Sequence, residues 1–108
     1  KDNFTIMKEE PFGPLVPILS FKDFDEIIER SNKNDLGLCS YICTNSMDQA
    51  HRASELMETG TVAVNTPVVA LAEAPFGGIK QTGYGREGGS MAIKDYLNIK
   101  YTHLGIKG

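Results

Sequence analysis

Two acidic side chains stand directly before a rigid turn near the start of the chain. Residues 9–14 read Glu-Glu-Pro-Phe-Gly-Pro, so two prolines and a glycine follow the acids. Pro11 disfavours helical backbone at Glu10 and holds that residue extended. A fixed, extended carboxylate is suited to accept hydrogen bonds from the two hydroxyls of a ribose. The residues alone leave two interpretations open, a ribose-binding acid and a solvated turn.

A third acid, Glu87, lies in a glycine-rich segment that imitates a phosphate-binding loop. Residues 83–88 (Gly-Tyr-Gly-Arg-Glu-Gly) fit the pattern G-x-G-x-x-G. In a dinucleotide-binding fold this pattern joins a strand to a helix, and an acid that ends a second strand follows about 20 residues later. We expect neither feature, because residues 75–78 read Pro-Phe-Gly-Gly and the chain is nearly finished. We predict an irregular loop whose glycines adopt positive φ, with Glu87 either an ion-paired surface acid or a buried acid beside a pocket.

The two cysteines, Cys39 and Cys43, lie four residues apart in a predicted strand, on the same side as Tyr41. They lack the second pair of ligands that zinc requires. They also lack the nearby base and positive surroundings that a nucleophilic thiol requires. We therefore expect buried structural thiols, no metal site, and histidines without a catalytic role at His51 and His103.

The composition describes one small domain. The chain has 108 residues, 41% apolar and 23% charged, and 11 Lys and Arg against 14 Asp and Glu give a net charge of -3. The apolar share excludes a disordered or collagen-like chain, and the apolar runs are far shorter than the roughly 20 residues that span a bilayer. No basic run is long enough to bind nucleic acid or an anionic membrane, so we expect neither partner. No secretory signal precedes Phe4, and two cysteines are too few for a disulfide scaffold, so we expect a cytoplasmic protein.

Alternating strands and helices are predicted to position these side chains. Asp23 and Ser46 each stand before an amphipathic stretch, as helix N-caps do, and Gly60 is the expected C-cap of the second helix. Short connections make the predicted arrangement an α/β fold with a right-handed parallel βαβαβ unit. The expected elements are a strand-like start at 4–7, a strand at 14–21 that Pro17 makes an edge or irregular strand, a helix from Phe24 to about 32–34, a strand at 38–44, a helix from Met47 towards Gly60, and a strand at 61–65.

The regular pattern breaks after Asn65. Residues 66–90 carry two prolines and six glycines with no strand or helix period. A connection of this length in a compact domain is usually functional. Beyond it, Ser90 is placed to cap a short helix that reaches Tyr96, and residues 98–106 alternate like a terminal strand.

Together these segments resemble the C-terminal part of the NAD(P)-dependent aldehyde dehydrogenases. The resemblance runs in order and spacing over essentially the whole chain. Residues 74–88 and the Lys100-Tyr101 ending look most like the succinate-semialdehyde dehydrogenase branch. The residues that carry the family resemblance are 9–14, Asn65, 75–88, 95–97 and Lys100.

The resemblance implies a division of the chain and a cofactor-binding role for its N-terminal turn. Residues 1–97 would be the last part of a catalytic domain, and residues 98–108 an oligomerisation strand and tail that adds to another subunit's sheet in a homo-oligomer. Glu10 would bind the nicotinamide ribose hydroxyls of NAD or NADP, in agreement with its extended carboxylate. Phe12 would pack by the nicotinamide ring.

The resemblance also implies a substrate pocket. Val68, Ala70 and Phe76 would line the aldehyde pocket, with the small Val68 and Ala70 leaving room for a longer or polar-tailed aldehyde. Glu87 would relay protons through water behind the catalytic site. The chain has Thr82 where a Ser is usual in the family, which is a conservative departure.

The family's reaction oxidises an aldehyde to a carboxylate. A cysteine thiolate attacks the aldehyde, hydride passes to the nicotinamide, and a general-base Glu activates the water that hydrolyses the thioester. The resemblance puts nucleophile, base and dinucleotide-binding domain upstream of Lys1, so we expect the chain alone to be inactive and neither Cys39 nor Cys43 to be the nucleophile. The alternatives are a non-catalytic module that pairs through its terminal strand and a stand-alone dinucleotide binder that uses residues 83–88.

Overall fold

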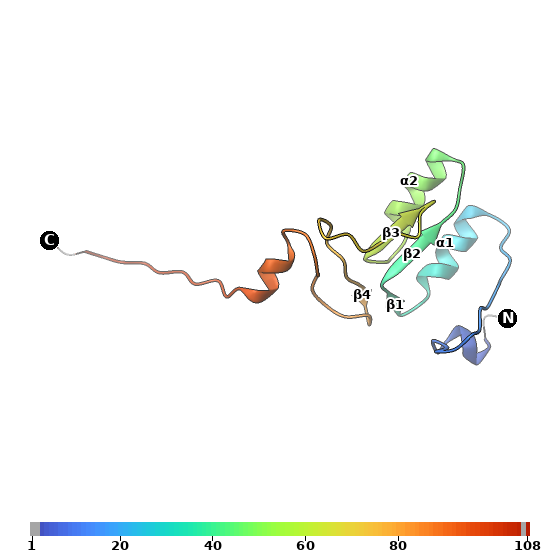
Figure 1. The fold of residues 1–108 in the computed structure, drawn as a ribbon, viewed down its shortest axis with the longest axis horizontal. Helices are drawn as coiled ribbons and strands as arrows, with labels where there is room; N and C mark the ends of the chain where they lie inside the picture. The colour runs from blue at the N-terminus through green and yellow to red at the C-terminus, as the bar shows by residue number, and fades with distance from the viewer. Residues whose placement is uncertain (1–2, 107) are drawn as a thin grey trace.

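The computed structural model describes residues 3–106 and 108, which form a small α/β layer with long irregular segments (Figure 1). Expectations that fall on Lys1, Asp2 or Lys107, such as the start of the first predicted domain, lie outside the described residues. In chain order, with η for a 3₁₀ helix, the elements are η1 (Thr5–Met7), α1 (Phe24–Asn32), β1 (Leu36–Gly37), β2 (Cys39–Ile42), α2 (Met47–Leu56), β3 (Thr61–Val64), β4 (Ile79–Lys80) and η2 (Ala92–Tyr96).

One parallel βαβ unit forms the centre of the fold. β2 and β3 pair in parallel, starting with Cys39 opposite Thr61, and α2 connects them. Apart from Ala63, every residue of β3 is β-branched, a type that favours strands. The most buried apolar side chains are Ala53 of α2 and Ala63 of β3, which are 3% and 5% exposed. These two small side chains form the only buried apolar core within residues 3–106 and 108.

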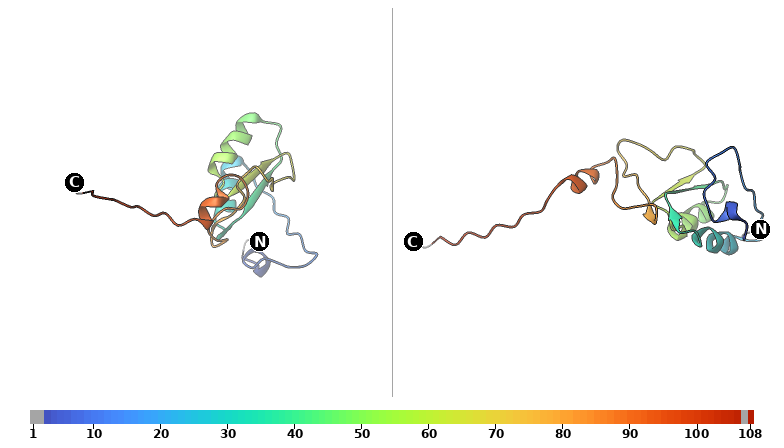
Figure 2. Two further views of the ribbon diagram at one scale, coloured as in Figure 1. Left: turned by 60° about the vertical axis from the view of Figure 1, so that its left-hand side comes forward. Right: turned by 90° about the horizontal axis from the view of Figure 1, so that it is seen from below.

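Both helices begin where the sequence predicts. Asp23 Oδ1 accepts a hydrogen bond from the Glu26 N–H at 2.9 Å, and Ser46 Oγ accepts one from the Gln49 N–H at 3.3 Å. These bonds satisfy backbone donors that a helix start leaves without partners. α1 ends at Asn32, within the predicted range. The right-hand view of Figure 2 shows both helices on one side of the strands.

The ends of the two helices are tied to each other and to β4. Asn32 Nδ2 donates to the Leu56 carbonyl at 2.8 Å, and Asn32 Oδ1 accepts from the Glu58 N–H at 2.9 Å. Lys80 Nζ donates to the carbonyls of Asn32 and Asn34 at 2.7 and 3.0 Å and pairs with Glu58 Oε2 at 2.6 Å. One ammonium group thus holds β4 against the carboxyl ends of both helices.

The predicted strand at 14–21 does not form, so the βαβαβ expectation was wrong for its first strand. A strand needs a neighbour for its backbone N–H and C=O groups, and two prolines in this segment remove N–H donors. Its side chains also stay in solvent, with Val16 81% and Ile18 88% exposed. The strand-like start at 4–7 was wrong as well, because Thr5–Met7 is a 3₁₀ turn.

Two expectations about glycines and strands also need correction. Gly60 does not cap α2, which ends at Leu56 with an extended Met57 as its C-cap. Instead, a side chain at Gly60 would collide with the carbonyl oxygen of Gly77, so the glycine permits a close backbone approach. A short strand, β4, does precede Gly83, and it pairs antiparallel with β1 rather than entering a parallel sheet.

The C-terminal segment projects away from the rest of the chain (Figures 1 and 2). η2 is a 3₁₀ helix whose N-cap is Met91 without a side-chain hydrogen bond, so the expected cap at Ser90 was wrong. Residues 98–106 have no strand partner within the described part of the chain. The radius of gyration is 19.4 Å, whereas a compact chain of this length has about 13 Å. None of the described helices is long and apolar enough to cross a membrane.

Candidate functional site

Phe76 and Glu87, two residues predicted for the site, face each other across the glycine-rich loop. Each backbone N–H donates to the other's carbonyl at 2.7 Å, which forms an isolated antiparallel bridge. Both residues line a small cavity of about 300 Å³, together with Asp95 and Tyr96 of η2. Phe76 is half-buried and Glu87 is exposed. Glu87 therefore borders the cavity while it remains exposed to solvent. It combines part of each predicted alternative, the surface acid and the acid beside a pocket.

The loop around this cavity is held by its own backbone and by Arg86. Arg86 Nη1 donates to the carbonyls of Gly78 and Gly85 at 2.9 and 2.7 Å, which draws the two limbs of the loop together. The Asp95 carboxylate accepts the Arg86 N–H at 2.9 Å. Glycines at 83, 85, 88 and 89 adopt positive φ, the backbone conformation expected of them.

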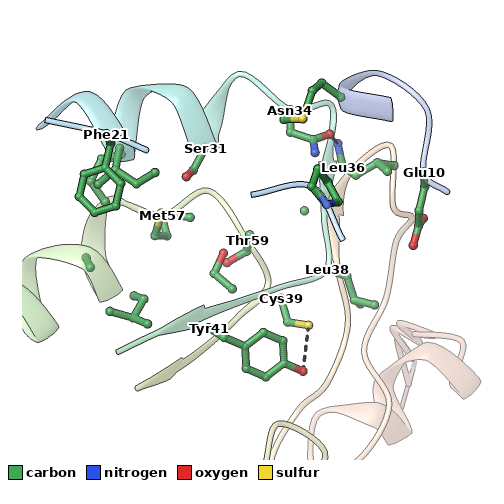
Figure 3. Close-up of a pocket in the computed structure, with 18 of the residues that line it drawn as sticks. Glu10, Phe21, Ser31, Asn34, Leu36, Leu38, Cys39, Tyr41, Met57 and Thr59 are labelled. Atoms are coloured by element: carbon green, nitrogen blue, oxygen red, sulfur yellow. Dashed lines mark hydrogen bonds between the residues drawn. The ribbon is translucent and has the colours of Figure 1, made fainter. Parts of the chain in front are cut away.

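A larger groove of about 1260 Å³ lies between the N-terminal segment, α1 and β2 (Figure 3). Glu10 and Pro11 line it from the N-terminal segment, and Cys39 and Tyr41 line it from β2. Figure 3 places Glu10 at one side of the groove, apart from the Cys39–Tyr41 pair. Glu10 is exposed, and its carboxylate has no hydrogen bond within the described residues.

Of the two cysteines, Cys39 lies in β2 together with Tyr41, whereas Cys43 follows the end of the strand. Cys39 Sγ lies 3.7 Å from the Tyr41 hydroxyl, in a hydrogen bond. This hydrogen bond with Cys39, aided by some desolvation, raises the pKa of Tyr41 above 10.0. Cys39 is half-buried and Cys43 is exposed. The expectation of buried thiols was therefore wrong, because β2 lacks a covering layer on this side.

The other predicted site residues lie apart from both cavities. Phe12 is 95% exposed and Val68 is 55% exposed, and Ala70 is also exposed. None of these three lines either cavity. The structure thus brings Phe76 and Glu87 together, and it leaves Glu10, Phe12, Val68 and Ala70 in other places. No group of three or more His, Cys, Asp or Glu side chains gathers as a metal site in residues 3–106 and 108.

Sequence reasoning named Asn65 and Asp95 among the residues of the resemblance but did not predict the contacts by which they shape the site. Asn65 begins the loop to Phe76 with φ 55°, and its side chain accepts from the Thr44 N–H at 3.0 Å and donates to the Thr44 carbonyl at 2.8 Å. An Asn directly after a strand is a signal for this geometry, because Asn tolerates positive φ. Asp95 contacts Arg86, which lies nine residues earlier in the chain, and no local sequence pattern predicts such a contact.

Comparison with known proteins identifies the family to which the chain belongs. Residues 1–102 match the Aldehyde dehydrogenase family. The chain belongs to that family. The resemblance seen in the sequence is therefore confirmed, and the fold is the aldehyde dehydrogenase fold of α/β type.

Aldehyde dehydrogenases with curated names or solved structures match along nearly all of this chain. Glutarate-semialdehyde dehydrogenase of Pseudomonas putida is 46% identical over 101 residues, which cover 94% of this chain and 21% of that protein. Succinate-semialdehyde dehydrogenase [NADP(+)] of Escherichia coli is 42% identical over 104 residues, 96% of this chain and 22% of that protein. The NAD+ complex of an aldehyde dehydrogenase from Bacillus cereus matches with a TM-score of 0.92 and 41% identity, covering 99% of this chain and 22% of that one. The chain thus spans about a fifth of the length of these relatives.

Proposed function

We propose that the protein carrying this chain oxidises an aldehyde to a carboxylate with NAD or NADP. The match of residues 1–102 to the aldehyde dehydrogenase family carries the proposal. Relatives named for glutarate and succinate semialdehyde favour an aldehyde with a carboxylate tail. The cytoplasmic location expected from the sequence stays a prediction.

In this proposal the chain supplies two parts of the catalytic centre. Glu10 binds the nicotinamide ribose, because its exposed carboxylate borders a groove and keeps its acceptor oxygens available. Phe12, 95% exposed, packs by the nicotinamide ring. NAD or NADP, when bound, supplies the hydride acceptor.

The substrate side of the centre comes from the loop after β3. Phe76, Val68 and Ala70 line the aldehyde pocket, and Glu87 relays protons through water. The bridge between Phe76 and Glu87 supports this part of the proposal, because it fixes a pocket residue and a proton-relay acid at one cavity. The nucleophilic cysteine, the general-base Glu and the dinucleotide-binding domain come from sequence outside this chain.

The proposal also gives a partner to the unpaired C-terminal segment. Residues 98–106 add to the sheet of another subunit in a homo-oligomer. The exposure of Ile99 and Ile106, 102% and 93%, supports a partner for this segment. The same exposure favours the alternative function, a non-catalytic module that pairs through this strand.

The test compares the 108-residue chain with the complete polypeptide that carries it. Each is incubated with NAD or NADP and with succinate semialdehyde, glutarate semialdehyde and unbranched aldehydes, and the reduced cofactor is followed by absorbance. We expect turnover by the complete polypeptide and none by the chain alone. Turnover by the chain alone contradicts the proposed division of the site, and inactivity of the complete polypeptide with every aldehyde contradicts the proposed reaction.

A further inference from the structure

We propose that Asp95 is a positioning residue for Glu87, a role that rests on the function proposed for Glu87. The observation that carries it is one hydrogen bond, in which Asp95 Oδ2 accepts the backbone N–H of Arg86 at 2.9 Å. Arg86 directly precedes Glu87 in the chain. Asp95 therefore fixes the backbone at the point from which the Glu87 side chain leaves.

Gly85 leaves room for this contact, and a side chain at that position would block it. A Cβ added to Gly85 would lie 2.7 Å from Asp95 Oδ2, so a side chain at Gly85 would push the carboxylate away. Gly85 also has φ 84°, a backbone conformation that other residues rarely adopt. The glycine thus lets η2 bring its carboxylate to the Arg86 N–H.

The same limb of the loop is fixed on its other side. The guanidinium of Arg86 donates to the Gly78 carbonyl at 2.9 Å, and Glu87 exchanges two 2.7 Å backbone hydrogen bonds with Phe76. With the Arg86 N–H bound by Asp95, neighbouring backbone groups of this limb are held from both η2 and the opposite limb. Asp95, Phe76 and Glu87 line one cavity, so a shift of the tether moves the proton-relay acid relative to the pocket.

The first arm of the test measures the tether without reference to catalysis. Amide hydrogen exchange over residues 74–90 is compared in the complete polypeptide and its Asp95→Ala, Asp95→Asn and Lys94→Ala variants. Loss of the hydrogen bond in Asp95→Ala is expected to raise exchange at Phe76, Arg86 and Glu87 about tenfold. Asp95→Asn retains an acceptor oxygen and is expected to restore protection. Lys94→Ala, a change at the neighbouring exposed position of η2, is expected to leave exchange unchanged.

The second arm asks whether the tether acts through Glu87. Asp95→Ala is expected to lower kcat about tenfold with little change in the KM for the aldehyde, and Asp95→Asn to restore most of it. In the Glu87→Gln background, Asp95→Ala is expected to have no further effect, because the group it positions has already lost its proton transfer.

The two arms separate failure of this inference from failure of the proposed function. Unchanged exchange in Asp95→Ala overturns the positioning role whatever the kinetics show. The positioning role is also overturned if the reductions in kcat caused by Asp95→Ala and Glu87→Gln multiply in the double variant, because the two residues then act independently. A Glu87→Gln enzyme with unchanged kcat, alongside raised exchange in Asp95→Ala, contradicts the relay role of Glu87 while the tether itself stands.

Discussion

Asn65 combines a left-handed backbone with a side chain that closes a ring of hydrogen bonds. Its φ is 55°, and its amide group binds both the N–H and the carbonyl of Thr44. Thr44 lies just beyond β2, and Asn65 lies just beyond β3. The side chain thus joins the ends of the two parallel strands at the point where the loop to Phe76 leaves the sheet.

Replacing Asn65 by Ala is expected to lower the free energy of unfolding by about 2 to 4 kcal/mol. Two hydrogen bonds of about 1 kcal/mol each are lost, and Ala tolerates positive φ less well than Asn does, which adds a further loss through backbone strain. Asn65→Gly is the matched control, because it loses the same hydrogen bonds without that strain. Urea denaturation should therefore find the Gly variant more stable than the Ala variant, and equal stabilities contradict the role given to the backbone.

Tyr41 provides a pH-dependent prediction. The hydrogen bond with Cys39 raises the pKa of Tyr41 above its ordinary value of 10.0, with smaller contributions from desolvation and from the electrostatic interaction with Cys39. Cys39→Ala is expected to lower the pKa of Tyr41 towards 10.0, as followed by the ring ¹³C shift of that tyrosine.

The direction of the stability effect follows from the same shift. The folded chain binds the Tyr41 proton more tightly than the unfolded chain does, so this contribution to stability is present below pH 10 and is lost as the pH rises further. An identical Tyr41 titration with and without Cys39 contradicts the assigned cause.

At the scale of elements, Lys80 ties the antiparallel pair of β1 and β4 to both helices. Its ammonium group has three donors, and the structure gives it three acceptors, on Asn32, Asn34 and Glu58. The side chain is 23% exposed, so water competes with these acceptors less than at a fully exposed pair. Lys80 also has φ 56°, a conformation that it keeps although a Cβ disfavours it.

Lys80→Met is expected to destabilise the fold by about 1 to 3 kcal/mol, because the acceptors at the ends of both helices lose their shared partner. Lys33→Met is the control, since the Lys33–Glu29 pair lies on the exposed surface of α1 and such pairs contribute little. Thermal or urea unfolding measures both. A Lys80→Met variant as stable as Lys33→Met contradicts the role of Lys80 as a tie between elements.

The elements that the sequence predicted correctly are those with local signals. Asp23 and Ser46 announce the two helices because a cap and its helix are neighbours in the chain. The strand at 14–21 was wrong because pairing depends on a partner strand that local sequence does not contain. The role of Gly60 was missed for a similar reason, since the group it must avoid belongs to Gly77. Phe76 and Glu87 were predicted for the site by resemblance, and the bridge between them required the folded loop.

At the scale of the whole molecule, the chain exposes more surface than a closed domain. Its accessible surface is 9205 Å², whereas a compact protein of this mass exposes about 5,900 Å². Extended segments at 8–21 and 98–106 account for much of this openness (Figure 1). Exposed apolar side chains in an extended segment with unpaired backbone groups favour pairing with another chain.

Sedimentation of the 108-residue chain tests the pairing of its C-terminal segment. The chain is expected to self-associate, and Thr102→Pro is expected to shift it towards monomer, because proline removes an N–H donor and cannot continue a strand ladder. Thr102→Val is the control, since it keeps both the donor and the preference for strand. A clean monomer for the unmodified chain contradicts pairing through residues 98–106.

The proposed function assigns the ribose acid, the pocket wall and the proton relay to this chain, and it places the nucleophile outside the chain. The most direct test is to quench the complete polypeptide with acid during turnover of succinate semialdehyde and to locate the acyl thioester by peptide mass spectrometry. We predict the acyl group on a cysteine outside residues 1–108, with Cys39 and Cys43 unmodified. An acyl group on Cys39 or Cys43 would contradict the account.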